Sequence, residues 1–159
     1  MTKEVRERAR QFLRENNLAV IATVTTNAES RPEAAVIHYF TDDLFNFYFI
    51  TRRHTRKFKN LQLNPHIAIV VGTTLMPHTI QMEGVAELLK EKEELLDFQR
   101  RIQLRPELHN LYLGAFSGSV FPKIRGLDFA VFRVKIKWLR WMDLDEETLD
   151  EKYHQILPE

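Results

Sequence analysis

The sequence predicts a mainly β protein: an antiparallel barrel of six strands, closed or nearly closed, with flanking helices. Aromatic residues, which favour strands, are numerous, with eleven Phe, four Tyr and two Trp. Strand-like segments recur along the chain, and most are joined by short polar turns, which favour antiparallel hairpins over crossovers. Because no repeat, linker or low-complexity tract divides the 159 residues, we expect a single domain over residues 1–159.

The first half of the chain reads as a helix, three strands and a second helix. Thr2–Asn16 places apolar residues at helical spacing, with charged residues on the other face. Three strand-like segments follow at Leu18–Thr25, Ala34–Phe40 and Leu44–Thr51. The next helix should cover Thr55–Leu63, because Pro65 disfavours helix at the residue before it.

The second half should supply three more strands, a third helix and a short helical tail. The strands are expected at His66–Gly72, His78–Leu89 and Asp128–Trp141. Glu91–Gln103 has the apolar spacing of a helix. Glycine and proline mark Leu104–Leu127 as loop-rich, and the acidic segment Glu146–His154 is expected to form a solvated helix.

The overall composition argues against several classes of function. Lys and Arg (23) nearly balance Asp and Glu (22), which is unlike a nucleic-acid-binding protein. With no cysteine there is no disulfide, thiolate nucleophile or Cys-ligated metal, and the histidines are too scattered to predict a metal site. The charged N-terminus and short apolar runs predict a cytoplasmic protein without a membrane segment.

The most informative segment is a basic turn between a strand and a helix, Thr51-Arg52-Arg53-His54-Thr55-Arg56-Lys57. The Thr55 hydroxyl can cap the helix that follows, and the amide groups of a first helical turn attract anions, typically phosphate. Cations at a helix N-terminus, here Arg56 and Lys57, are disfavoured by the helix dipole unless a bound dianion offsets them. The alternative is a solvated basic turn without a ligand.

This turn and its surroundings resemble the pyridoxamine 5′-phosphate oxidase-like family. The basic turn is followed by Asn60-Leu61, Leu63-Asn64-Pro65 and the strand Ile67–Val71, which resemble that family's flavin-phosphate segment. Upstream, Leu18–Val24 and Ser30-Arg31-Pro32 resemble its first strand and hairpin, and Gln81–Glu87 resembles a later strand. The resemblance is clear over roughly residues 5–90, and looser over 128–143.

The resemblance implies a split β-barrel of the FMN-binding type and assigns the cofactor to particular residues. It implies that Thr55, Arg56 and Lys57 hold the FMN phosphate, with help from Thr51. It places the isoalloxazine ring along the strand Glu33–His38, with Ala34, Ala35, Val36 and Ile50 as the ring-side residues.

The resemblance also implies an oxidoreductase that works as a homodimer, with the flavin at the interface and a small-molecule substrate. Thr79 and Gln81 would then approach the flavin from the partner subunit. No catalytic residue is assigned, because the flavin carries the redox chemistry.

Departures from the family pattern bear on the substrate. Ala34 and Ala35 stand where the vitamin B6 oxidase has an arginine, and the C-terminal Arg-x-His-x-Arg pattern that grips its substrate is absent. Oxidation of pyridoxamine phosphate is therefore not expected. The alternatives left open are a deazaflavin coenzyme or haem in the same groove, and a non-enzymatic module, either an FMN carrier or sensor or a dimer that has lost its ligand.

Several other residues admit a structural and a functional interpretation. His38 is expected in the core or at the rim near the flavin, and His54 in the basic turn. Of Trp138 and Trp141, one could face the flavin or the dimer interface, although core packing is favoured for both. Ser117-Gly118-Ser119 lacks the frame of a nucleophile and reads as a loop. Lys123 and Arg125 are expected to be solvated, or else to reach an anionic substrate.

Overall fold

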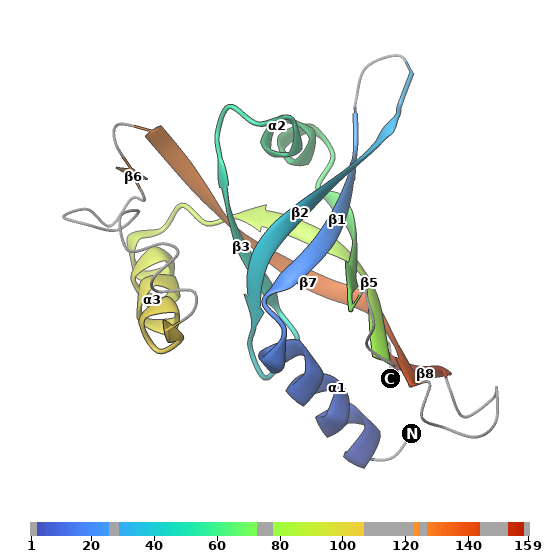
Figure 1. Cartoon of the computed structure of the whole chain (residues 1–159). Helices are drawn as coiled ribbons and strands as arrows, with labels where there is room; N and C mark the ends of the chain where they lie inside the picture. Colours follow the sequence, from blue (N-terminus) through green and yellow to red (C-terminus); the bar gives the residue numbers. More distant parts are fainter. Residues whose placement is uncertain are drawn as a thin grey trace.

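The computed structural model describes residues 3–25, 29–72, 78–106, 123–124, 127–143 and 153–157. Three helices and eight strands are assigned among them (Figure 1). The helices are α1 (Lys3–Glu15), α2 (Arg56–Leu63) and α3 (Lys92–Gln103). The strands are β1 (Leu18–Val24), β2 (Pro32–Thr41), β3 (Phe47–Arg52), β4 (His66–Val71), β5 (His78–Leu88), β6 (Lys123–Ile124), β7 (Leu127–Asp143) and β8 (Tyr153–Leu157).

The strands form a closed antiparallel barrel, which confirms the predicted fold class. The order around the barrel is β3-β2-β1-β4-β5-β7, and β3 pairs with β7 to close it. The 17-residue β7 makes this closure possible, because it pairs with β3 and β5 and also carries β6 and β8. The register of β5 against β7 shifts at Gly84, where a Cβ would lie 2.6 Å from the Lys135 carbonyl oxygen.

The barrel interior is the main hydrophobic core, and two helices lie at its opposite ends (Figure 1). Aromatic rings stack inside it: the Tyr39 and Phe47 centroids lie 4.5 Å apart, and those of Phe49 and Phe132 5.3 Å apart. At one end α1 buries Phe12 and its apolar neighbours, and at the other α2 buries Phe58 and its own. The amphipathic spacing read from the sequence therefore marks the core-facing side of each helix.

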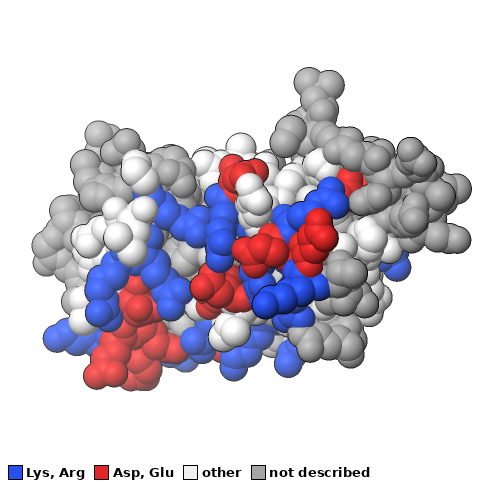
Figure 2. Space-filling view, turned by 90° about the horizontal axis from the view of Figure 1, so that it is seen from below, with Lys and Arg blue, Asp and Glu red and all other residues white. Residues whose placement is uncertain are grey.

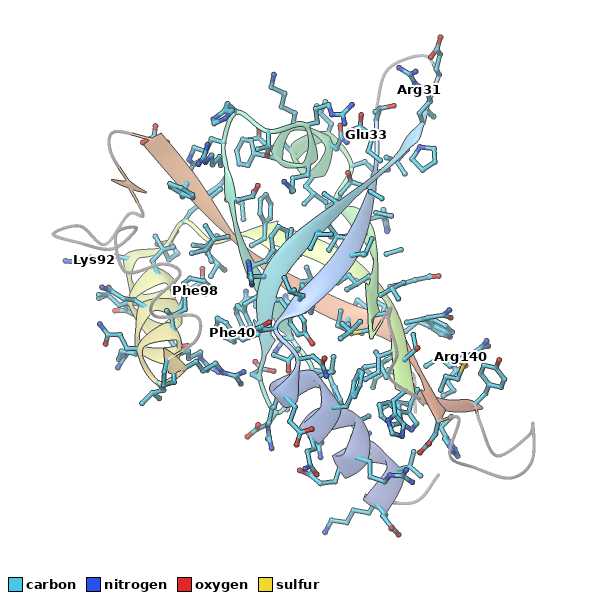
Figure 3. The ribbon with its side chains drawn as sticks, in the orientation of Figure 1. Arg31, Glu33, Phe40, Lys92, Phe98 and Arg140 are labelled. Carbon is cyan, nitrogen blue, oxygen red and sulfur yellow. The ribbon has the colours of Figure 1, made fainter. Side chains whose placement is uncertain are left out.

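A second apolar cluster lies outside the barrel, beneath α3. The outward-facing Phe40, Tyr48 and Ile50 of β2 and β3 are buried there against Phe98 and its neighbours on α3. Figure 3 shows Phe98 directed from α3 toward Phe40, and the two ring centroids lie 5.3 Å apart. This helix therefore covers one outer face of the barrel.

The third strand begins later than the sequence indicates, at Phe47 rather than Leu44. The Asp42 carboxylate accepts hydrogen bonds from the backbone amides of Leu44 and Asn46, and Phe45 adopts a positive φ of 63°. These bonds hold residues 42–46 as a turn, so the strand can start only after it.

The predicted tail helix is wrong at its C-terminal end. Residues 144–152 lie outside the described part of the chain, but Tyr153 and His154 belong to β8, which pairs with β7. Ile156 of β8 is fully buried in the barrel core. Pairing with the preceding strand, β7, therefore overrides the local helical pattern. In the predicted loop 104–127, residues 107–122 are not described, and Lys123–Ile124 form β6.

The charge distribution matches the near-neutral composition. Figure 2 shows basic and acidic side chains interspersed on the face seen from below, rather than gathered into one basic patch. Several of the described charged side chains form ion pairs, such as Arg14 with Asp43 (2.6 Å). Among the described residues, none of the helices is long and apolar enough to cross a membrane.

Candidate functional site

The turn between β3 and α2 is built around two threonines. Thr51 is buried at the end of β3, and its Oγ1 lies 3.1 Å from that of Thr55. The Thr55 hydroxyl donates to the Arg52 carbonyl oxygen (2.8 Å) and accepts a hydrogen bond from the Phe58 amide (3.4 Å). Thr55 is thus the predicted N-cap of α2, and it draws the basic turn together at the end of the barrel that α2 covers.

A pocket of about 340 Å³ lies at this end of the barrel, between α2 and the β1–β2 hairpin. Cross-strand pairs of β1 and β2 line its floor, since Ile21 pairs with Ala35 and Thr23 with Glu33. The other lining residues are Ala34, His54, Thr55, Arg56 and Lys57. The pocket therefore combines hydroxyl and cationic donors with small side chains along one strand.

Glu33, the first residue of the strand expected beside the ring, lines the pocket through its side chain, and no role was predicted for that side chain. Its Oε1 lies 2.9 Å from Arg56 Nη1, and its Oε2 accepts a hydrogen bond from Asn60 Nδ2 at 3.0 Å. The buried Asn60 amide also donates to Thr23 Oγ1 at 3.1 Å. Figure 3 shows Glu33 on β2 beside α2. A single acidic residue at the start of a strand has no local pattern that would reveal these partners.

Lys57 is a partly buried cation of the pocket. Partial burial lowers the pKa of its ammonium below the usual lysine value, because desolvation disfavours the charged form. Arg56 is different: its side chain is 82% exposed and reaches across the pocket to Glu33. A bound anion would therefore meet one exposed guanidinium, already paired with Glu33, and one partly buried ammonium whose charged form a nearby negative charge favours.

The structure brings together most of the predicted phosphate and ring-side residues. Thr55, Arg56 and Lys57 line the pocket together with Ala34 and Ala35. Thr51 does not line it, but contacts Thr55 directly.

Three predicted cofactor residues lie away from the pocket. Ile50 is buried in the cluster beneath α3. Val36 lies on the outer face of β2, two residues beyond Ala34 and 66% exposed. Gln81 is exposed on β5, and the order β2-β1-β4-β5 places it three strands from β2, about 14 Å away at the usual strand spacing. Within one chain, Gln81 and the pocket residues do not form a common site.

A second, apolar hollow of about 380 Å³ lies on the outer face of the sheet, next to the first pocket. Ala22 and Val24 of β1, Ala68 of β4 and Val85 of β5 line it, with Glu83 and Lys137 among its charged residues. We define the open face as the apolar residues of this hollow together with Ala34 and Val36 of β2. Its members are Ala22, Val24, Ala34, Val36, Ala68 and Val85. Among the described elements, α3 covers the other face and leaves this one exposed.

The remaining candidate residues are placed as follows. His38 is half-buried on β2, and its Nδ1 has no hydrogen-bond partner among the described residues. His54 is exposed and lines the pocket. Trp141 is buried in the core and stacks on His78 (centroids 5.0 Å apart).

Trp138 instead lies at the surface, where its Nε1 donates to Gln155 (3.2 Å) and Arg140 stacks on its ring. Ser117–Ser119 and Arg125 lie outside the described residues, as does the side chain of Lys123. In the described part of the chain, His, Asp and Glu side chains do not gather in groups of three that could hold a metal ion.

Comparison with known proteins places this fold and pocket in a family. The model of the family described as pyridoxamine 5′-phosphate oxidase matches residues 5–142. A pyridoxine/pyridoxamine 5′-phosphate oxidase from Salinibacter ruber is 32% identical over 89 residues, which make up 56% of this chain and 40% of the relative. The chain thus matches less than half of that relative's length.

Solved structures share the architecture at low sequence identity. A pyridoxamine 5′-phosphate oxidase-related, FMN binding protein from Nostoc punctiforme has a TM-score of 0.61 at 19% identity, with 98% of this chain and 97% of that one covered. A heme binding protein from Mycobacterium smegmatis has a TM-score of 0.66 at 20% identity, covering 89% and 55%. These likenesses show a common fold.

Proposed function

This chain belongs to the pyridoxamine 5′-phosphate oxidase family, and from that premise we propose that it is an FMN-binding flavoprotein acting as an oxidoreductase on a small molecule. The proposal treats residues 1–159 as one cytoplasmic FMN-binding domain that works as a homodimer. The observation that carries it is the pocket beside α2, where Ala34, Ala35, Thr55, Arg56 and Lys57 meet.

The donor set of the pocket fits a phosphate monoester. Arg56 and Lys57 supply the positive charge, and the Thr55 and Thr51 hydroxyls lie beside them. A charge-assisted hydrogen bond contributes roughly 1.5–3 kcal/mol net. Three or four such bonds supply much of the roughly 8 kcal/mol that corresponds to a micromolar dissociation constant.

The strand next to the phosphate donors suits a flat ring. Ala34 and Ala35 are small, so a planar group can approach the β2 backbone, and Ala34 and Val36 both belong to the open face. Ile50 can contribute only through its backbone, since its side chain is buried beneath α3. When bound, FMN would supply hydride transfer, and the chain's own residues would bind it, orient it and exclude water.

A homodimer explains why Gln81 and Thr79 lie far from the pocket of their own chain. The open face carries apolar side chains that include the 66% exposed Val36. A second copy placed on this face would cover it and would bring β5 residues toward the pocket of the first. The flavin would then lie at the interface between the two subunits.

The substrate is proposed only as a small molecule. Ala34 and Ala35 provide no guanidinium where the vitamin B6 oxidase has one, which disfavours pyridoxamine phosphate. Deazaflavin, haem and a non-enzymatic FMN carrier or sensor remain the rival functions. Of these rivals, haem has a structural neighbour whose name states haem binding.

The first test is an absorbance spectrum of the purified protein before and after incubation with excess FMN and desalting. Flavin bands that stay with the protein support the proposal, whereas a haem or deazaflavin spectrum replaces it with that rival. Bleaching of the bound flavin by reduced nicotinamide, at a useful rate, would separate an enzyme from a carrier.

The second test removes the two cationic donors. The double variant Arg56→Ala/Lys57→Ala should fold normally and bind FMN at least about tenfold more weakly, because the phosphate loses its charged partners. Lys92→Ala/Arg100→Ala, which removes the same charge from α3, is the control and should bind FMN as the wild type does. Equal FMN content in the first variant and the wild type would overturn the site assignment.

A further inference from the structure

The pocket proposed for the phosphate contains a carboxylate. Glu33 is the only acidic residue among those described as lining it, and its side chain is only 19% exposed. It faces the cation with which a phosphate would pair, since Oε1 lies 2.9 Å from Arg56 Nη1. A site that serves only to attract a dianion would not be expected to hold a fixed negative charge there.

The two partners in this ion pair differ in how firmly they are held. Glu33 is anchored by the buried Asn60, which bonds its second oxygen at 3.0 Å and is itself tied to Thr23 at 3.1 Å. Arg56 is 82% exposed, so its guanidinium can move without losing packed contacts. If an anion enters, Arg56 can turn toward it while Glu33 stays in place.

From this geometry we infer that Glu33 is a specificity-determining residue that weakens the binding of the phosphate group. A phosphate must compete with Glu33 for Arg56, and it then lies near a carboxylate that repels it. Both effects lower the affinity for phosphorylated flavin and leave that for the unphosphorylated flavin nearly unchanged. The wild-type pocket therefore binds FMN more weakly than the same pocket would without this carboxylate.

This inference rests on the proposed function, because it requires the flavin phosphate to bind at Arg56. It also explains why the mobile and the fixed member of the pair are arranged in this way. A fixed arginine and a mobile glutamate would let the carboxylate swing aside when the phosphate arrives. Here the Glu33 carboxylate stays in place, and Arg56 is shared between Glu33 and the phosphate.

The test compares FMN with riboflavin, which lacks the phosphate, in the wild type and in Glu33→Gln. The amide keeps the shape of the side chain and can still accept the hydrogen bond from Asn60. FMN should bind about five- to tenfold more tightly to the variant, while riboflavin affinity should change by less than about twofold. Quenching of flavin fluorescence gives both dissociation constants, and thermal unfolding checks the fold.

Glu29→Gln is the matched control. Glu29 lies in the same hairpin and pairs with Arg31 at 3.2 Å, but it does not line the pocket. The Glu29→Gln substitution removes the same charge and should leave the affinities for FMN and for riboflavin unchanged. Tightening of FMN binding by the control as well would assign the effect to overall charge and overturn the role of Glu33.

The Arg56→Ala substitution, made in both backgrounds, supplies an independent readout. If Glu33 competes for Arg56, the loss of FMN affinity is larger in Glu33→Gln than in the wild type, because the guanidinium there is fully available. Unchanged or weaker FMN binding to Glu33→Gln, or an equal gain for riboflavin, would overturn the inference while leaving the proposed function standing. Failure of the wild type to bind either flavin would instead remove the proposed function, and this inference with it.

Discussion

The barrel has two outer faces that are formed by similar strands, but only one of them is covered by a helix. On one face α3 covers β2, β3 and β7, so Phe40, Tyr48 and Ile50 are buried. On the open face Val36 of the same β2 strand is 66% exposed, although Phe40, four residues later on the same side of the strand, is only 2% exposed. The difference lies in what covers each residue.

The contrast shows how one strand can serve both stability and binding. Where α3 covers β2, aromatic rings stack, as Phe40 does on Tyr48 with centroids 4.9 Å apart. Where β2 is uncovered, the side chains are small, as at Ala34 and Val36, and a planar ligand or a second copy can approach the backbone. The covered face is therefore expected to govern the stability of the monomer, and the open face its association.

The largest effect is expected from Phe98→Ala on the covered face. Removing this buried ring should lower the free energy of unfolding by about 3–5 kcal/mol, because it leaves a cavity between α3 and the barrel. Val36→Ala on the open face should lower it by less than about 0.5 kcal/mol. Urea denaturation measures both, and similar losses for the two variants would contradict the contrast between the faces.

The next largest effect is expected from Val36→Asp, which tests the open face as the dimer interface. A carboxylate buried between two subunits should raise the dimer dissociation constant by at least about tenfold, because it loses its water without gaining a partner. Light scattering at several concentrations measures this. Leu44→Asp, at a residue of the β2–β3 turn that is 78% exposed, is the control and should leave association unchanged. A wild type that is monomeric at every concentration would contradict the proposal that the open face is a dimer interface.

The smallest effect concerns the alkaline stability contributed by Tyr48. Burial beneath α3, together with the Asp42 carboxylate that accepts its hydrogen bond, raises the pKa of Tyr48 to about 12. The folded state thus favours the neutral phenol, and this part of the stability is complete below pH 10 and is lost as the pH rises toward 12. After allowance for solvent screening, the loss is about 1–2 kcal/mol.

Tyr48→Phe isolates this contribution. Urea denaturation at pH 10 and at pH 12 should show a smaller loss of stability for the variant than for the wild type. Tyr39, whose pKa burial also raises, is present in both proteins and cancels in the comparison. Equal losses would mean that the pKa of Tyr48 does not differ between the folded and the unfolded state.

Local patterns predicted those features whose cause lies within a few residues. The Thr55 cap is an example, since its hydroxyl bonds an amide three residues later. The end of α2 at Leu63 is another, because Asn64-Pro65 follows it directly. The Asn64 side-chain oxygen also accepts a hydrogen bond from the backbone amide of His66, where β4 begins. The apolar faces of α1 and α3 were predictable for the same reason.

Features that depend on distant partners were missed or misread. Tyr153 and His154 looked helical in an acidic tail, but they pair with residues of β7. Glu33 looked like an ordinary polar residue, yet it meets Arg56 and Asn60, which are more than twenty positions away in the sequence. Such contacts depend on how β2, α2, β7 and β8 are placed in space, which the local sequence patterns do not specify.

The sequence by itself therefore determined the elements, the barrel class and the basic turn that forms one wall of the pocket. These follow from side-chain periodicity, turn residues and helix capping, all of which act over short stretches of chain. Only the tertiary structure decided that β7 closes the barrel against β3, that α3 covers one face and leaves Val36 exposed, and that Glu33 lies across from Arg56. The physical reason is that burial and ion pairing depend on which segments meet in space, and residue order alone does not specify those meetings.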